Sequence, residues 1–179
     1  MYAKLSLQEA IMSKKAQKFN LIKDCIAQAM FELLKTKEFK DIKISELTEK
    51  AGVSRITYYR NFFDKKDVIT YAFERYSDEY FEKNKDAKDP ILTVTRYMLS
   101  MKKPIMILYQ ANLSYILQDY IYRYIGPKKD TPKDQVYYRA GMAGFFWGYI
   151  NQWIKDDMKK TPEEVSKDVH SFQMKLSME

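Results

Sequence analysis

Apolar residues recur at three- and four-residue spacing along almost the whole chain, which is the pattern of amphipathic helices. The first strong stripe comprises Leu21, Ile22, Ile26, Ala29, Met30, Leu33 and Leu34. It predicts one long helix from about Lys15 to Thr36. Only five glycines and five prolines interrupt the 179 residues. The pattern therefore predicts an all-α fold of about nine helices.

Two short helices are predicted next, over 44–51 and 55–61, with a Gly52-Val53-Ser54 turn between them. Gly52 suits the left-handed conformation that follows a helix, and Ser54 suits the N-cap of the second helix. Asp64 can cap a fourth helix, which runs into a charged stretch that ends near Pro90. We expect two domains, 1–76 and 77–179, with the boundary near that stretch.

The second domain is expected to hold about five helices separated by prolines. Three of the five glycines, Gly141, Gly144 and Gly148, fall within one predicted helix, where each costs ~1 kcal/mol relative to alanine. Such a cost suggests close approach of another helix or room for a ligand. The last helix begins at a marked signal, with Thr161 as N-cap, Pro162 at the first position and two glutamates in the first turn.

Composition removes several classes of protein. The hydrophobic content of 46% rules out intrinsic disorder, and the charged content of 31% rules out a membrane-spanning chain. One cysteine, Cys25, and one histidine, His170, leave few residues for a disulfide, a zinc site or a catalytic triad. No apolar run of a signal peptide begins the chain. We expect a cytoplasmic protein that has no metal or cofactor and does not bind a membrane.

The net charge of +7 is concentrated near the N-terminus. Residues 1–75 carry 15 Lys+Arg and 10 Asp+Glu, a net of +5, whereas the other residues carry 16 and 14, a net of +2. On charge alone, solvation of helix faces is favoured over nucleic-acid binding as the explanation of these lysines.

A tight turn between two short helices is the layout of a helix-turn-helix, whose second helix enters the major groove of DNA. In the helix after Ser54, Tyr58 and Phe62 share one face and can anchor it inward. Arg55 on the outward side can pair with guanine, and Ile56 can meet a thymine methyl group. An ordinary helical hairpin with a solvated face is the alternative.

The whole string favours the first interpretation, because it resembles the DNA-binding domain of TetR-family bacterial transcriptional regulators. The resemblance covers about residues 15–76. It is carried by Ile44 to Ser54, Thr57-Tyr58-Tyr59, Phe62, Asp64-Lys65, Asp67-Val68-Ile69 and the aromatic Phe39. Glu38, Lys43 and Lys66 depart from the family pattern at a helix end, a helix start and the residue after the lysine.

The resemblance implies that Arg55 and Ile56 contact base edges with help from Thr57, and that Tyr59 and Lys65 hold phosphates. The DNA-binding residues that we expect are Lys43, Ser45, Ser54, Arg55, Ile56, Thr57, Tyr59, Arg60, Asn61 and Lys65. Lys14, Lys15 and Lys18 can add a basic arm, or can serve only as solubilising charge.

The last two helices resemble the pair that forms an intermolecular four-helix bundle in the same family. A short recognition helix reads few base pairs, so a homodimer on a palindromic operator in double-stranded DNA is expected. The expected interface residues are Phe145, Trp153, Val169 and Phe172, with packing inside the protomer as the alternative.

Tyrosines and methionines in the middle helices can form a core or line a pocket for an apolar or aromatic effector. The candidate pocket residues are Met98, Met101, Tyr109, Tyr115, Tyr138 and Trp147. By resemblance, an effector bound there releases the DNA.

The leading hypothesis is a dimeric transcriptional regulator that acts as a repressor. The alternative is a helical co-regulator that keeps the fold but acts through a protein partner. An enzyme has the least support, because the sequence has no phosphate-binding glycine loop, no metal-ligand spacing and no base for a nucleophile beyond one histidine.

Overall fold

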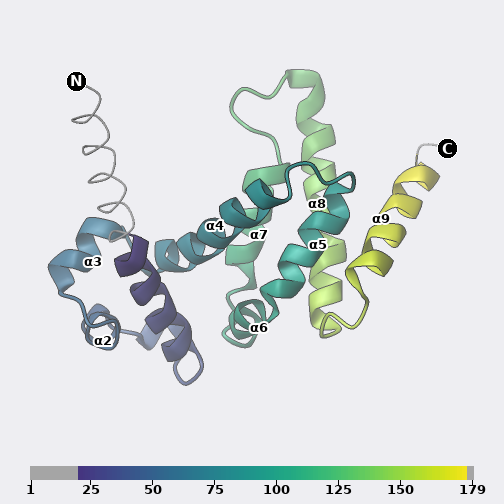
Figure 1. Cartoon of the computed structure of the whole chain (residues 1–179). Helices are drawn as coiled ribbons and strands as arrows, with labels where there is room; N and C mark the ends of the chain where they lie inside the picture. Colours follow the sequence, from purple (N-terminus) through teal and green to yellow (C-terminus); the bar gives the residue numbers. More distant parts are fainter. Residues whose placement is uncertain (1–19, 177–179) are drawn as a thin grey trace, which may run out of the picture. The chain divides into compact units, whose positions relative to one another are not determined.

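The computed structural model describes residues 20–176 (Figure 1). Within that range the chain forms nine α-helices, two short 3-10 helices and no strand, so the all-α prediction is confirmed. The expected helix start at Lys15 and the candidate arm of Lys14, Lys15 and Lys18 lie outside the described residues.

The first helix covers residues 20–34 of the described range. The elements that follow are η1 (Phe39–Asp41), α2 (Ile44–Lys50), α3 (Arg55–Asn61), α4 (Lys65–Lys83), α5 (Pro90–Ser100), α6 (Lys102–Gln110), α7 (Ser114–Ile125), η2 (Lys133–Gln135), α8 (Val136–Lys155) and α9 (Pro162–Leu176). The chain divides into two compact units between Phe73 and Glu74, and α4 continues through that division.

Unit 1 is built around the apolar stripe of the first helix. Ile26 and Met30 on that stripe are completely buried, as are Leu47 of α2 and Tyr58 of α3. Val68 near the start of α4 completes the same core. The three- and four-residue spacing of the sequence thus becomes one buried face on each helix.

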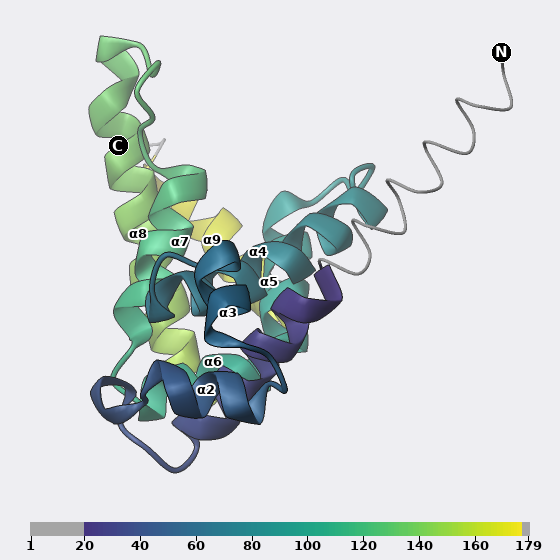
Figure 2. The ribbon, with the colours of Figure 1, turned by 90° about the vertical axis from the view of Figure 1, so that its left-hand side faces the viewer.

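Unit 2 is built from two packed helix pairs, α5 with α9 and α7 with α8. The members of each pair lie side by side in both Figure 1 and Figure 2. The core comprises Ile105, Leu108, Ile116, Ile150, Ile154 and Val165, all with exposed fractions of 1% or less. Among the described residues, no helix combines the length and apolar character needed to cross a membrane.

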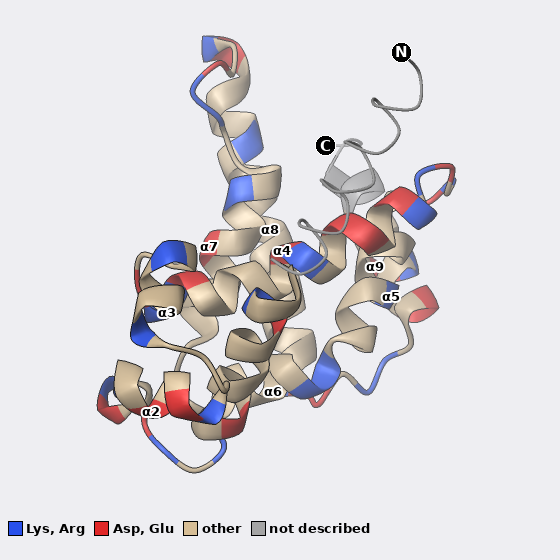
Figure 3. Ribbon diagram, turned by 60° about the vertical axis from the view of Figure 1, so that its left-hand side comes forward, with Lys and Arg blue, Asp and Glu red and all other residues tan. Residues whose placement is uncertain are grey.

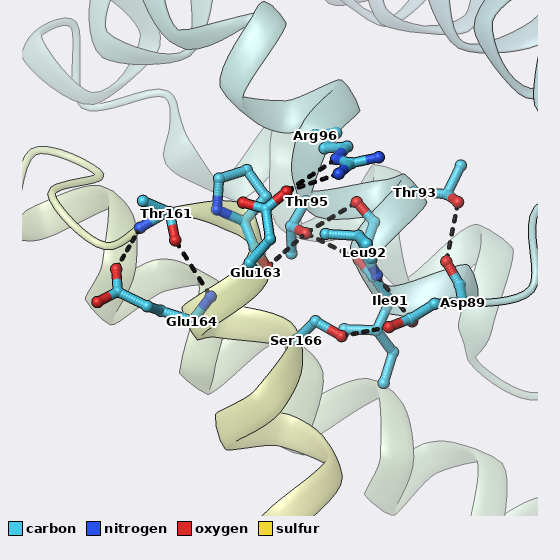
Figure 4. A network of polar contacts seen from close by, with 11 residues as sticks. Asp89, Ile91, Leu92, Thr93, Thr95, Arg96, Thr161, Glu163, Glu164 and Ser166 are labelled. Atoms are coloured by element: carbon cyan, nitrogen blue, oxygen red, sulfur yellow. Dashed lines mark hydrogen bonds and ion pairs between the residues drawn. The ribbon is translucent and has the colours of Figure 1, made fainter.

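Polar contacts join the beginnings of α5 and α9 (Figure 4). Asp89 caps α5 by accepting a hydrogen bond from the Leu92 amide at 2.9 Å, and its other oxygen accepts from the Ser166 hydroxyl of α9 at 2.6 Å. Arg96 forms an ion pair with Glu163 at 2.6 Å. These contacts hold the two helix starts together.

The start of α9 has the reciprocal cap that the sequence predicts. The Glu164 amide donates to the Thr161 hydroxyl at 3.2 Å, and the Thr161 amide donates to the Glu164 carboxylate at 2.7 Å. Two amides that a helix leaves without partners are satisfied in this way.

Asp89 should contribute stability that depends on pH. Burial acts to raise the pKa of Asp89, but hydrogen bonds from Ser166, Leu92 and His170 outweigh it and hold this pKa below its ordinary value of 3.8. A carboxylate with a lowered pKa stabilises the fold above its unfolded pKa, and the contribution disappears as pH falls through the folded value. Asp89→Ala should therefore lower the free energy of unfolding by about 1–2 kcal/mol at neutral pH.

Asp89→Asn is the matched control, because asparagine keeps an N-cap oxygen without the charge. The smaller loss of unfolding free energy caused by Asp89→Asn should begin to shrink near pH 3.8 and approach zero only well below it, in urea unfolding series taken from neutral pH into that range. A loss from Asp89→Asn that stays constant over this range would contradict the role of the charge.

Candidate nucleic-acid interface

A tight turn joins α2 to α3, and Figures 1 and 2 show these two short helices near the first helix, drawn in purple. Gly52 has a φ of +67°, so it takes the left-handed conformation that the sequence predicts. The Val53 amide donates to the Thr48 carbonyl at 3.0 Å and closes the end of α2. The Ser54 hydroxyl then accepts from the Thr57 amide at 3.1 Å, which caps α3.

Tyr58 and Phe62 anchor α3 to the rest of unit 1. Their exposed fractions are 0% and 5%, and their ring centroids lie 5.9 Å apart. Phe62 also packs edge-on against Tyr71 of α4 at 5.7 Å. The Lys23 ammonium lies 4.1 Å from the Tyr71 ring centroid, a cation–π contact that closes the cluster. Burial raises the pKa of Tyr58 to about 12, so this hydroxyl stays neutral.

The outer face of α3, defined as Arg55, Ile56, Tyr59 and Arg60, is exposed to solvent. Ile56 is 65% exposed and Tyr59 is 64% exposed, so an apolar and an aromatic side chain lie beside the two arginines on this face. Figure 3 shows the Lys and Arg positions of α3 in blue. The face thus combines two guanidinium groups, one apolar side chain and one hydroxyl.

Several neighbouring cations form ion pairs with carboxylates, whereas in the described structure the two arginines of α3 do not. Lys35 pairs with Glu32, Lys37 with Glu46 and Lys40 with Glu38. Within residues 20–176, Arg55, Arg60 and Lys43 form no ion pair. Phosphate oxygens are suitable partners for such unpaired cations.

The other predicted DNA-binding residues lie in differing surroundings. Lys43 is exposed at the start of α2, where its side chain makes no cap hydrogen bond. Ser45 is half-buried and is the second residue of the same helix. Thr57 is half-buried, with its hydroxyl 2.9 Å from that of Ser54.

Asn61 and Lys65 direct their polar groups into unit 1. The Asn61 amide group donates to the Thr57 carbonyl at 2.7 Å, and its Oδ1 is buried without a partner in the described structure. The Lys65 ammonium donates to backbone carbonyl groups between the first helix and α2.

Phe63 is an exposed aromatic residue beside α3 that the sequence does not single out. Its exposed fraction is 91%, and its amide donates to the Asp67 carboxylate at 3.0 Å. The Phe62-Phe63 pair in the sequence could have predicted one exposed phenylalanine, because adjacent residues at a helix end face different directions and only one of them can enter the core.

The six candidate pocket residues do not share one environment. Met98 of α5 and Met101 between α5 and α6 are buried, whereas Tyr138 on α8 is 69% exposed and Tyr115 on α7 is 44% exposed. Tyr109 on α6 is half-buried and donates to Asn151 of α8 at 2.7 Å. Burial raises the pKa of Tyr109 to about 12. Trp147 on α8 is half-buried.

The four candidate interface residues divide into two groups. Trp153 and Val169 are 4% and 1% exposed, so both side chains lie in the core of unit 2 within one protomer. Trp153 also donates to the Lys160 carbonyl at 3.0 Å. Phe145 and Phe172 stack at 4.5 Å, and Phe172 remains 43% exposed. The stacked pair is thus the accessible part of the predicted set.

Within the part of the chain that the structure describes, no three acidic, histidine or cysteine residues are grouped so that they could hold a metal ion. The chemical groups that the outer face of α3 presents are guanidinium groups, a hydroxyl group and an apolar side chain.

Part of the chain matches a known family. Residues 79–175 match the sequence model of a TetR family described as "Transcriptional regulator C-terminal region", and this match covers more than half of the 179 residues. A search of curated proteins finds no match. The match lies within unit 2, so the geometry of α2 and α3 is an independent observation.

Gly52 should resist substitution because of its backbone conformation. A Cβ at this position would have no atom within 4 Å, so space is not the constraint. Gly52→Ala should lower the free energy of unfolding by about 1–2 kcal/mol, because the left-handed region is costly for a residue with a Cβ. Gly52→Asn should cost about half as much, since asparagine tolerates this region. Equal losses in thermal unfolding would contradict this account.

Proposed function

Because the chain belongs to the TetR family of transcriptional regulators, we propose that it is a dimeric, sequence-specific DNA-binding repressor that a small-molecule effector releases from its operator. The observation that carries the proposal is the outer face of α3. Arg55 and Arg60 on this face are exposed and form no ion pair within the described residues.

In the proposed complex α3 lies in the major groove of DNA. Arg55 at its first position reaches a base edge, where a guanidinium group can bond two acceptors of guanine. Ile56 contacts a thymine methyl group, with Thr57 beside it. Tyr59, Arg60, Lys43 and Ser45 contact the phosphate backbone, and the N-terminus of α2 adds its dipole. Base contacts then give specificity, and phosphate contacts give position.

A dimer gives the site enough length to be specific. Two copies of α3 would read half-sites about 34 Å apart, one helical turn of DNA. The proposed interface is the exposed part of α8 and α9. Phe145 and Phe172 lie there, and Gly141 and Gly148 leave the α8 backbone open, with nothing within 4 Å of an added Cβ. Gly144 differs, because its Cβ would meet the Tyr122 hydroxyl at 3.2 Å.

The effector proposal rests on unit 2, where hydroxyl groups lie among apolar helices. Tyr109 and Asn151 join α6 to α8, with Met98 and Met101 buried in the same unit. An apolar or aromatic ligand with one polar group suits such surroundings. Ligand binding there would act on DNA through a two-state dimer.

Arg55→Ala should weaken binding to the preferred operator by about 5- to 150-fold, equivalent to ~1–3 kcal/mol, and should relax the preference for one base. The probe is a duplex taken from DNA upstream of the protein's own gene, titrated against a mixed-sequence duplex of equal length. Lys35→Ala is the control, because Lys35 already pairs with Glu32. If Arg55→Ala gives the same DNA-binding isotherms as the wild type, Arg55 does not contact DNA.

Gly148→Leu should weaken the dimer about tenfold or more, equivalent to ~1.4 kcal/mol, because a large side chain would keep the partner's helix from the α8 backbone. Without a partner the same change should be tolerated, since the position is open. Lys103→Leu, at an exposed position of α6, is the matched control. Sedimentation measures both, and a wild-type monomer at micromolar concentration would overturn the dimer proposal.

A further inference from the structure

Lys65 is the first residue of α4, and its ammonium group points at three backbone carbonyl oxygens. The Lys65 Nζ lies 2.5 Å from the Phe39 oxygen, 2.8 Å from the Ile42 oxygen and 3.4 Å from the Lys40 oxygen. These carbonyls belong to η1 and to the extended residue that follows it. The contact therefore joins parts of the chain that are 23 to 26 residues apart.

The surroundings of the Lys65 ammonium match its bonding capacity. An ammonium group has three N–H donors, and three carbonyl oxygens face it. Its nitrogen also lies 4.7 Å from the centroid of the Phe39 ring, which is a cation–π contact. Burial lowers the pKa of Lys65, against an opposing effect of Asp41, so the group is partly removed from water.

The carbonyl groups around Lys65 gain partners from this arrangement. In a 3-10 helix of only three residues, most carbonyl oxygens accept no hydrogen bond from an amide of the same helix. A phosphate contact by Lys65 would require it to give up at least one of these bonds. Arg60 and Lys43 face no such cost, because neither forms an ion pair within the described residues.

From this geometry we infer that Lys65 is a positioning residue, which fixes the start of α4 to residues 39–42 and so closes the loop of chain that carries α2 and α3. Its ammonium group does not contact the DNA backbone. This reverses the phosphate role that the family resemblance implies for Lys65. The part of the inference that concerns DNA rests on the proposed function, but the carbonyl contact does not.

The test compares Lys65→Met, Lys65→Arg and Lys43→Met in the full chain. Methionine keeps much of the apolar stem without the charge. Lys65→Met should lower the Tm by roughly 5–10 °C without DNA. Lys65→Arg should not restore it, because a planar guanidinium cannot direct donors at the same three oxygens. If Lys65 held a phosphate instead, arginine would replace it well.

The salt dependence of DNA binding separates positioning from phosphate contact. One lost phosphate contact in each half of a dimer flattens the slope of log K against log[salt] by about 1.8. Lys43→Met should show such a change, whereas Lys65→Met should leave the slope within about 0.3 of the wild type. Equal flattening by the two variants would overturn the inference.

Nitrogen-15 NMR of lysine ammonium groups tests the wild-type chain directly, whatever the variants do to folding. The Lys65 ammonium should give a signal protected from solvent exchange in the free protein, and mixed-sequence DNA should not shift it. An unprotected signal, or a shift as large as that of Lys43, would overturn the inference. If the wild type binds no DNA, the proposed function fails, and the Tm and protection results still decide the carbonyl contact.

Discussion

The short helix α3 depends on the burial of two aromatic side chains, Tyr58 and Phe62. α3 has seven residues, which is too short for a helix to be stable in water by itself. Tyr58 and Phe62 are four residues apart and enter the core together, and burying such a side chain contributes about 1.5–3 kcal/mol. Because Arg55, Ile56 and Tyr59 share the same short backbone, this burial also sets the direction in which they project.

The packing of unit 1 determines which of its basic side chains are bound to other groups of the protein. The net of +5 over residues 1–75 counts every lysine alike, but the structure gives them different roles. Lys23 packs over an aromatic ring, Lys65 binds carbonyl groups, and Lys37 pairs with Glu46. Arg55 and Arg60 have no such partner in the described structure. Within residues 20–75, fewer cations therefore lack a partner than the sequence count indicates, and Arg55 and Arg60 of α3 are two of them.

Local signals in the sequence were sufficient for the helix ends, because a cap involves residues only three or four apart. Gly52, Ser54 and the Thr161–Glu164 box adopt the predicted roles for this reason. Contacts over long separations could not be predicted in the same way. The ammonium of Lys65 and the carbonyls of residues 39–42 meet only after the first helix, α2 and α4 have packed, and Ser166 meets Asp89 only when α9 packs on α5.

The same limit explains why the apolar stripe of α9 does not separate its buried residues from its exposed ones. Val165 and Val169 are four residues apart and both enter the core, with exposed fractions of 0% and 1%. Phe172 follows three residues later, which turns it toward the edge of that face, where it stacks on Phe145. A periodic stripe marks both residues as apolar but does not say where the core ends. In the proposed dimer the partner's helix would pack against this edge and against the bare backbone at Gly141 and Gly148. The exposed Phe145–Phe172 stack and the open glycines of α8 would then both be explained by contact with the partner.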